Sequence, residues 1–477
     1  MKSPGMARMW LLLAMIGGSS VALALSETPL WAAVSGFVIA CSLCLMQEST
    51  GLFNFRILTI PGFCYVIYVF IVVIPSFWVF SDKQGSFRVA FLFAVESALI
   101  TIPLGIMLAK HFFHFGRSET LVFFEAPIQE GPSEPTLESF FVLLTFVLVL
   151  SATKFFETRT VPLFYLLSHP GEFALVDRLR EETGKLSDSP LNYLYGISET
   201  ILYPFLIVLA FGKYLHTKRW SWALCFWASF IPGLLFIGSS TAKAPVARIF
   251  LVLCGYFYLW RRGKVEATFG VSFIILFFAF PIFVTLQKYS GFVHLGPALQ
   301  EMGRRLFYAP AECLYYYFEV FPHVVPYQHG ATIGKFAMLI GQQPFDAANV
   351  VGRYMEPKAF FTTNATAPFL GSLNADFGMI GVLLGGILAG AVMQAAQSFV
   401  VRSGKSVLAL TMYVLFLRSL MDISTTALAI VLMSSGTAFV FLLKWTVSGL
   451  DSVVGGALRT SHHVPAYRLT HDRRRHL

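Results

Sequence analysis

Long apolar runs recur along the chain, and they constrain its fold more than any other feature. A helix of about 20 residues crosses the roughly 30 Å hydrocarbon layer of a bilayer. We mark twelve runs of about that length, at 8–25, 29–46, 57–80, 88–108, 137–156, 196–215, 220–237, 245–260, 267–286, 374–400, 406–423 and 425–445. The runs are continuous rather than alternating, so they predict membrane helices and not a barrel.

The composition supports this class. Of the 477 residues, 56% are hydrophobic and 13% charged, whereas about a quarter of a soluble domain is charged. We therefore predict an all-α polytopic membrane protein, with residues 1–445 as a single transmembrane domain. The run at 8–25 has features of a signal peptide, but it is long for one and is kept as a span. Nucleic-acid binding is not expected.

Basic connections predict the orientation of the spans. The short segments 213–220, 261–264 and 402–405 and the tail 446–477 are rich in lysine and arginine, which places them in the cytoplasm. With twelve spans, both termini are then cytoplasmic. Two large loops, 157–195 and 287–373, fall outside. The second is too long to be structureless and is predicted to be functional and partly helical.

Charged residues inside apolar runs need a reason, because burying a charge in the bilayer is costly. Arg418 and Asp422 lie four residues apart in one run, on one face of the predicted helix. They form either a structural ion pair or part of a site, and both interpretations stay open. Glu96 has no assigned partner. Glu199 lies at the outer start of its span, where an interfacial position explains it.

Several cations map to the outer half of the predicted bundle. A guanidinium fork matches phosphate oxygens in a bidentate manner. An anionic ligand such as a lipid diphosphate would therefore suit the set formed by Lys243, Arg248, Arg304, Arg305, Arg353 and Arg418. The simpler alternatives are surface ion pairs and arginines that extend to the headgroups.

A polar segment, 364–376, precedes a glycine-rich apolar run. The outer end of a helix is predicted there, where free N–H groups favour an anion or a polar ligand. No P-loop, HExxH or GxSxG motif occurs, and the outer histidines lack metal-ligand spacing. The sequence thus offers a cationic outer site and no metal site.

Four stretches make the chain resemble the Wzy-type O-antigen polymerases and related oligosaccharide repeat-unit polymerases. They are "RRLFYAPAECLYYYFEVFP" (304–322), "NATAPFLGSLNADFGMIGVLLGGILAG" (364–390), "GSSTAKAPVARIF" (238–250) and, more weakly, "FLRSLMDISTTAL" (416–428). The resemblance covers mainly residues 238–430. Arginine usually leads the family's short cationic turn, and Lys243 stands nearest that place here.

The resemblance implies a function in the bacterial inner membrane. Such enzymes join oligosaccharide repeat units carried on undecaprenyl diphosphate, by glycosyl transfer at the periplasmic face. They need no sugar nucleotide or ATP, because the diphosphate is already a good leaving group, and they are expected to work without metal or other cofactor. The implied partners are the lipid-linked oligosaccharide and membrane lipids. A chain-length regulator and a flippase are candidate protein partners.

Residue roles follow as hypotheses. The six cations named above would bind the diphosphate. Asp376, Glu312 and His323 are candidate general bases for the acceptor hydroxyl, although Asp376 has the alternative role of a helix cap. Asn364, Asn374, Tyr316 and Tyr317 would contact the glycan. Two other functions stay open: a flippase for lipid-linked oligosaccharide, and an O-antigen ligase-like glycosyltransferase.

Overall fold

The computed structural model is all-helical throughout the residues that it describes. These are 29–50, 59–129, 134–158, 160–169, 191–241, 243–261, 303–339, 341–357 and 364–461, with 172, 175–176, 178–180, 296 and 300. No strand occurs within these ranges.

Within those ranges, eight helices are long and apolar enough to cross a membrane: Ile60–Asp82, Arg88–Phe112, Leu137–Glu157, Leu191–Thr217, Trp220–Gly238, Phe369–Arg402, Val407–Ser424 and Leu428–Ser452. Two shorter apolar helices are Val34–Thr50 and Pro245–Trp260. These ten coincide with ten of the twelve predicted runs, which confirms the helical fold and supports the prediction of a membrane protein. The other two runs, 8–25 and 267–286, lie outside the described residues.

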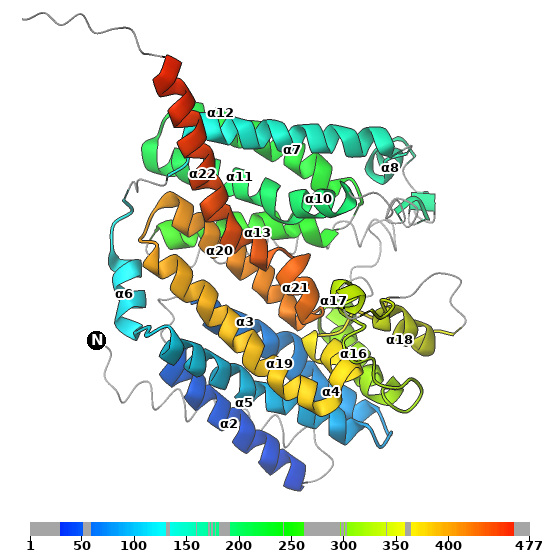
Figure 1. Ribbon diagram of the computed structural model, residues 1–477. Helices are drawn as coiled ribbons and strands as arrows, with labels where there is room; N and C mark the ends of the chain where they lie inside the picture. Colours follow the sequence, from blue (N-terminus) through cyan, green and yellow to red (C-terminus); the bar gives the residue numbers. More distant parts are fainter. Residues whose placement is uncertain are drawn as a thin grey trace, which may run out of the picture.

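The helices form two groups with a central helix between them (Figure 1). The first group holds α2 (Pro29–Thr50), the continuous helix α3–η1–α4 (Ile60–Tyr68, Val69–Val73, Ile74–Asp82), α5 (Arg88–Phe112) and α19 (Phe369–Arg402). The second holds α7 (Leu137–Glu157), the continuous helix α10–η2–α11 (Leu191–Ile197, Ser198–Leu202, Tyr203–Thr217), α12 (Trp220–Gly238) and α13 (Lys243–Trp260). Both groups contact α20 (Val407–Met421).

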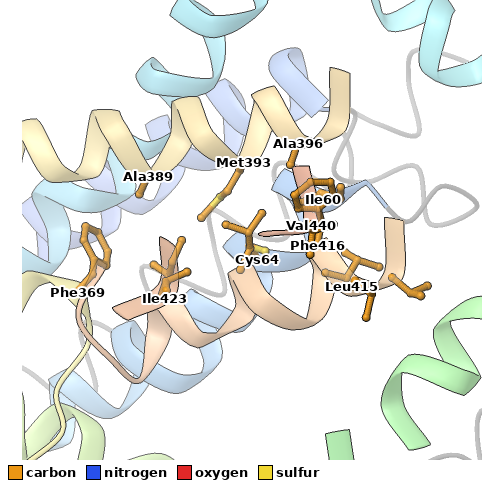
Figure 2. Packing of buried hydrophobic residues seen from close by; sticks show 14 of the residues in the cluster. Ile60, Cys64, Phe369, Ala389, Met393, Ala396, Leu415, Phe416, Ile423 and Val440 are labelled. Atoms are coloured by element: carbon orange, nitrogen blue, oxygen red, sulfur yellow. The ribbon is translucent and has the colours of Figure 1, made fainter. Parts of the chain in front are cut away.

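The central helix α20 is apolar on every side, which is the pattern of a fully enclosed helix. Every residue from Val407 to Leu420 is buried. Figure 2 shows part of the resulting core, where Cys64 of α3, Met393 of α19 and Phe416 of α20 are among the packed side chains. Because α20 is enclosed, any polar side chain on it must find partners inside the protein.

Shorter elements close the two ends of the bundle. At one end lie η3 (Arg304–Tyr308), α16 (Ala309–Val320), α17 (Gly334–Leu339), α18 (Ala347–Met355), η4 (Asp422–Ser424) and α21 (Leu428–Met433). We call this the α16 end; α8 (Pro162–Ser168) lies on the same side of the view in Figure 1. At the other end, the α6 end, lies α6 (Arg117–Glu125).

Segments that the sequence assigns to one side of the membrane meet at the α6 end. Lys405 donates to the carbonyl of Phe124 (2.7 Å), and Lys213 pairs with Glu134 (2.6 Å). The segment 109–136 is therefore next to both 213–220 and 402–405, two basic connections that the sequence predicts to lie on one side of the membrane. The α22 helix (Thr437–Ser461) also runs toward this end, since Lys444 bonds to Ser403 (2.9 Å).

Two predicted boundaries differ from the structure. The run 425–445 corresponds to the candidate span Leu428–Ser452, which is interrupted at Gly436 (φ +86°), between α21 and α22. The segment predicted as a tail from residue 446 begins as helix, because α22 continues to Ser461.

The α5–α19 seam depends on glycine. A Cβ on Gly390 would lie 2.0 Å from the carbonyl oxygen of Ile102, and one on Gly105 would lie 2.0 Å from that of Ile387. Small residues let membrane helices approach until their backbones touch. The glycine-rich run noted in the sequence therefore brings α19 onto α5.

The α19 helix is broken at Gly378, where φ is 62° and ψ is −152°. The break leaves carbonyls without their usual helical donors. The carbonyl of Ala375 accepts instead from the N–H of Gln328 (2.9 Å), and that of Asp376 accepts from His329 (3.0 Å). The polar segment 364–376 is thus exposed at its beginning, at Asn364 and Thr366, and buried at its end, where Asp376 is only 1% exposed.

Candidate functional site

A cavity of about 80 Å³ lies where α13, α20 and the η2–α11 segment meet, in the half of the bundle toward the α16 end. It is lined by two arginines, one carboxylate and five other residues: Arg248, Arg418, Glu199, Thr200, Pro204, Pro245, Ile249 and Val252. A cavity needs about 10–15 Å³ to hold one water. This one therefore has room for several waters or for a small anionic group.

Arg418 is the most enclosed cation of the site. It projects from the buried helix α20 and is 4% exposed. Its Nη1 donates to the carbonyl of Ser435 (3.0 Å), in the turn between α21 and α22. A guanidinium carries five N–H donors, and this is its one hydrogen bond to the described part of the chain. The remaining donors are available to a ligand in the cavity that Arg418 lines.

Arg248 comes from the second turn of α13 and pairs with Asp422 (Nη2 to Oδ1, 2.6 Å). The other oxygen of Asp422 accepts from the hydroxyl of Ser435 (2.9 Å). The sequence offered Arg418 and Asp422 as a pair on one helical face. The structure joins Asp422 to Arg248 instead; Asp422 begins the 3₁₀ turn η4, where α20 ends.

Glu199 faces the same cavity from η2, a π-helical turn. Its Oε2 lies 3.9 Å from Lys154 Nζ of α7. Lys154 in turn stands 4.5 Å from the centre of the Phe236 ring, a favourable place for a cation. Pro204 follows η2 and has no N–H for the carbonyl of Thr200. A π turn followed by proline therefore shapes this wall.

Sequence reasoning missed two members of this cluster. Glu199 was explained as an interfacial residue, and Lys154 was not singled out. The available signal was the same one that marked Arg418: a charged residue inside an apolar run. Together, three cations and two carboxylates leave one positive charge in excess around the cavity. Such an enclosure favours an anion.

The other predicted phosphate ligands lie elsewhere. Arg304 and Arg305 are exposed on η3, which packs on α4, and Arg353 is exposed on α18. Lys243 is the first residue of α13, and its side chain lies outside the described part of the structure. The structure therefore brings Arg248 and Arg418 together and sets Arg304, Arg305 and Arg353 on the α16 end.

The three candidate bases occupy three separate places. Asp376 accepts from the N–H of Thr332 (3.2 Å) and from its hydroxyl. Glu312 pairs with Lys83 (3.0 Å). The exposed ring of His323 lies 4.4 Å from that of Phe87. None of the three lines the cavity.

The predicted glycan contacts are partly enclosed. Tyr317 donates to the carbonyl of Ala365 (3.3 Å), and Asn374 donates to the carbonyl of Tyr317 (3.4 Å); both are buried. Asn364 is exposed. Tyr316 is half-buried and accepts from Lys83 (3.1 Å). Burial lowers the pKa of Lys83, but its bonds to Tyr316 and Glu312 outweigh this and raise that pKa above its ordinary value.

Two further observations limit what the described residues offer. They contain no group of three or more His, Cys, Asp or Glu side chains arranged to hold a metal ion. A second cavity, of about 20 Å³, lies toward the α6 end beside Lys110, Gln394 and Gln397, and it has room for about one water. The larger, arginine-lined cavity is thus the better candidate site for a ligand bigger than one water.

Comparison of the chain with protein-family models, with curated proteins and with solved structures finds no match.

Proposed function

We propose that this protein is a bacterial inner-membrane polysaccharide polymerase. It would join undecaprenyl-diphosphate-linked repeat units by glycosyl transfer at the periplasmic face. The observation that carries the proposal is the cavity between Arg248 and the enclosed Arg418. It lies toward the α16 end, where the long segment predicted as periplasmic also folds.

The arginines would stabilise the leaving diphosphate. When the anomeric C–O bond breaks, negative charge grows on the phosphate oxygens. Cations fixed in a water-poor site stabilise such charge without having to reorganise, and this is commonly the largest catalytic contribution. Arg418 has unused N–H donors toward the cavity, while Asp422 holds Arg248 in place. No metal ion is required in this scheme.

The rest of the α16 end would bind the sugars. Arg304, Arg305 and Arg353 add positive charge there, and Tyr316 and Asn364 offer groups that are not fully buried. In this proposal the α16 end faces the periplasm and the α6 end the cytoplasm, with twelve spans, two large periplasmic loops and both termini inside.

Variants of the two cavity arginines test the function. Arg248→Ala and Arg418→Ala are expected to lower the chain-extension rate by at least about 100-fold, comparable to the loss of one oxyanion-stabilising group. The measurement is the length distribution of glycan made from lipid-linked repeat units in membranes. Arg402→Ala is the matched control, because Arg402 lies at the α6 end and pairs with Glu119 (3.6 Å).

Deletion of the protein separates a polymerase from the two alternative functions. Loss of a polymerase leaves single repeat units attached to the final acceptor. Loss of a ligase or of a flippase leaves none attached. Normal chain lengths in both cavity variants, with the protein present in the membrane, would remove the proposal.

A further inference from the structure

We propose that Glu199 accepts the proton of the attacking sugar hydroxyl. The proposal rests on the polymerase function above and assigns a residue that the sequence hypotheses placed elsewhere, on Asp376, Glu312 and His323. It starts from a simple requirement: the base must face the same space as the groups that hold the leaving diphosphate. Glu199 is the carboxylate that lines the cavity with Arg248 and Arg418.

The nearby carboxylate, Asp422, is already occupied. One of its oxygens pairs with Arg248 at 2.6 Å, and the other accepts from Ser435 at 2.9 Å. Glu199 has neither a close ion pair nor a hydrogen bond of this kind. It makes no hydrogen bond to the described residues, and its closest cation, Lys154, is 3.9 Å away. A carboxylate held this loosely keeps its lone pairs for a substrate hydroxyl.

Four cations act on Glu199, and three of them come from three different helices. They are Lys154 of α7, Arg418 of α20, Arg248 of α13, and Arg180, with Asp422 paired to Arg248. Lys154 is fixed by its contact with Phe236. We assign Lys154 as a positioning residue that orients Glu199.

The proposed step balances as follows. The acceptor hydroxyl oxygen forms a bond to the anomeric carbon of the donor sugar. The bond from that carbon to the phosphate oxygen breaks, and its electron pair leaves with the lipid diphosphate beside Arg418 and Arg248. The hydroxyl proton passes to a carboxylate oxygen of Glu199. Product release and proton loss to water restore the carboxylate.

The experiment uses the full-length protein in liposomes with lipid-linked repeat units. Glu199→Gln keeps the size of the side chain and removes its basicity. We expect chain extension to slow by about 10²–10⁴-fold, with binding of the undecaprenyl diphosphate donor changed less than about threefold. The fall in wild-type rate at low pH, where Glu199 becomes protonated, is expected to vanish in this variant.

Three further arms separate a base from a structural role. Glu199→Asp is expected to recover part of the rate. Formate added to Glu199→Ala is expected to raise its rate, because the small anion can enter the cavity. Glu119→Gln, at the α6 end, is the control for losing a carboxylate. Protein level in the membrane is measured for every variant.

The outcomes are distinguishable. If Arg418→Ala abolishes extension while Glu199→Gln retains both the rate and the pH profile, the base proposal falls and the polymerase function stands. Loss of donor binding in Glu199→Gln also overturns it, because Glu199 would then serve the diphosphate. If the wild-type protein does not extend chains, both proposals fall.

Discussion

At the scale of single residues, the ion pair between Arg248 and Asp422 connects two helices that are distant in sequence. The Asp422 side chain is 5% exposed and that of Arg248 is 28% exposed. Asp422→Asn leaves a cation with a weak neutral partner, so we expect the free energy of unfolding to fall by about 1–3 kcal/mol. Thermal unfolding in detergent measures this change.

A double-mutant cycle with Arg248→Gln checks the cause. If the pair itself is responsible, the double variant loses less stability than the two single losses combined. Additive losses would show that each side chain acts separately.

The sequence indicated the cavity arginines but not their partners. Arg248 and Arg418 stood out because a charge in an apolar run has to be explained. Which carboxylate each one meets depends on how helices distant in sequence pack together, as α13 and α20 do, and hydropathy alone does not give that packing. Lys154 of α7 and Glu199 of η2 likewise meet only through the packing of two separate helices.

At the scale of elements, the positions of the helices followed from hydropathy, whereas the break in α19 did not. Gly378 is one of several glycines in its run, and no local pattern distinguishes the one whose φ is positive. The break is set by long-range contacts, because residues 328–329 supply the donors that the interrupted helix lacks.

Gly378→Ala tests that break. Its backbone, at φ 62° and ψ −152°, lies in a region that is essentially restricted to glycine. A Cβ would also lie 3.0 Å from the Tyr327 ring. We expect a loss of about 1–3 kcal/mol, seen as a lower unfolding midpoint. The control is Gly449→Ala in α22, where nothing lies within 4 Å of the new Cβ; equal midpoints for both variants would contradict the prediction.

Gly390→Ala tests the α5–α19 seam. The new methyl group would meet the carbonyl oxygen of Ile102 at 2.0 Å. The atoms that the methyl group would meet belong to the α5 backbone and cannot rotate away, so the two helices have to move apart. Overpacking of this kind costs about 1–3 kcal/mol. Less folded protein in the membrane and a lower midpoint are the expected results. An unchanged midpoint would mean that the seam is looser than its glycines indicate.

At the scale of the whole molecule, the bundle has two chemically different ends. Two short basic connections lie at the α6 end. Lys213 of one pairs with Glu134, and Lys405 of the other donates to the carbonyl of Phe124 in α6. The α16 end holds the cavity and the folded part of the long loop. In the proposed orientation, which follows the positive-inside rule, the α16 end faces the periplasm.

Cysteine labelling tests this orientation. In a background without the six native cysteines, a single cysteine replaces either Val324, which is 58% exposed toward the α16 end, or the exposed Ser118 at the α6 end. A membrane-impermeant maleimide is expected to label Val324→Cys in intact cells and Ser118→Cys only after permeabilisation. The reverse pattern would put the arginine cavity on the cytoplasmic side. A polymerase that acts on periplasmic repeat units requires the arginine cavity on the periplasmic side. The labelling pattern therefore tests both the orientation and the proposed chemistry.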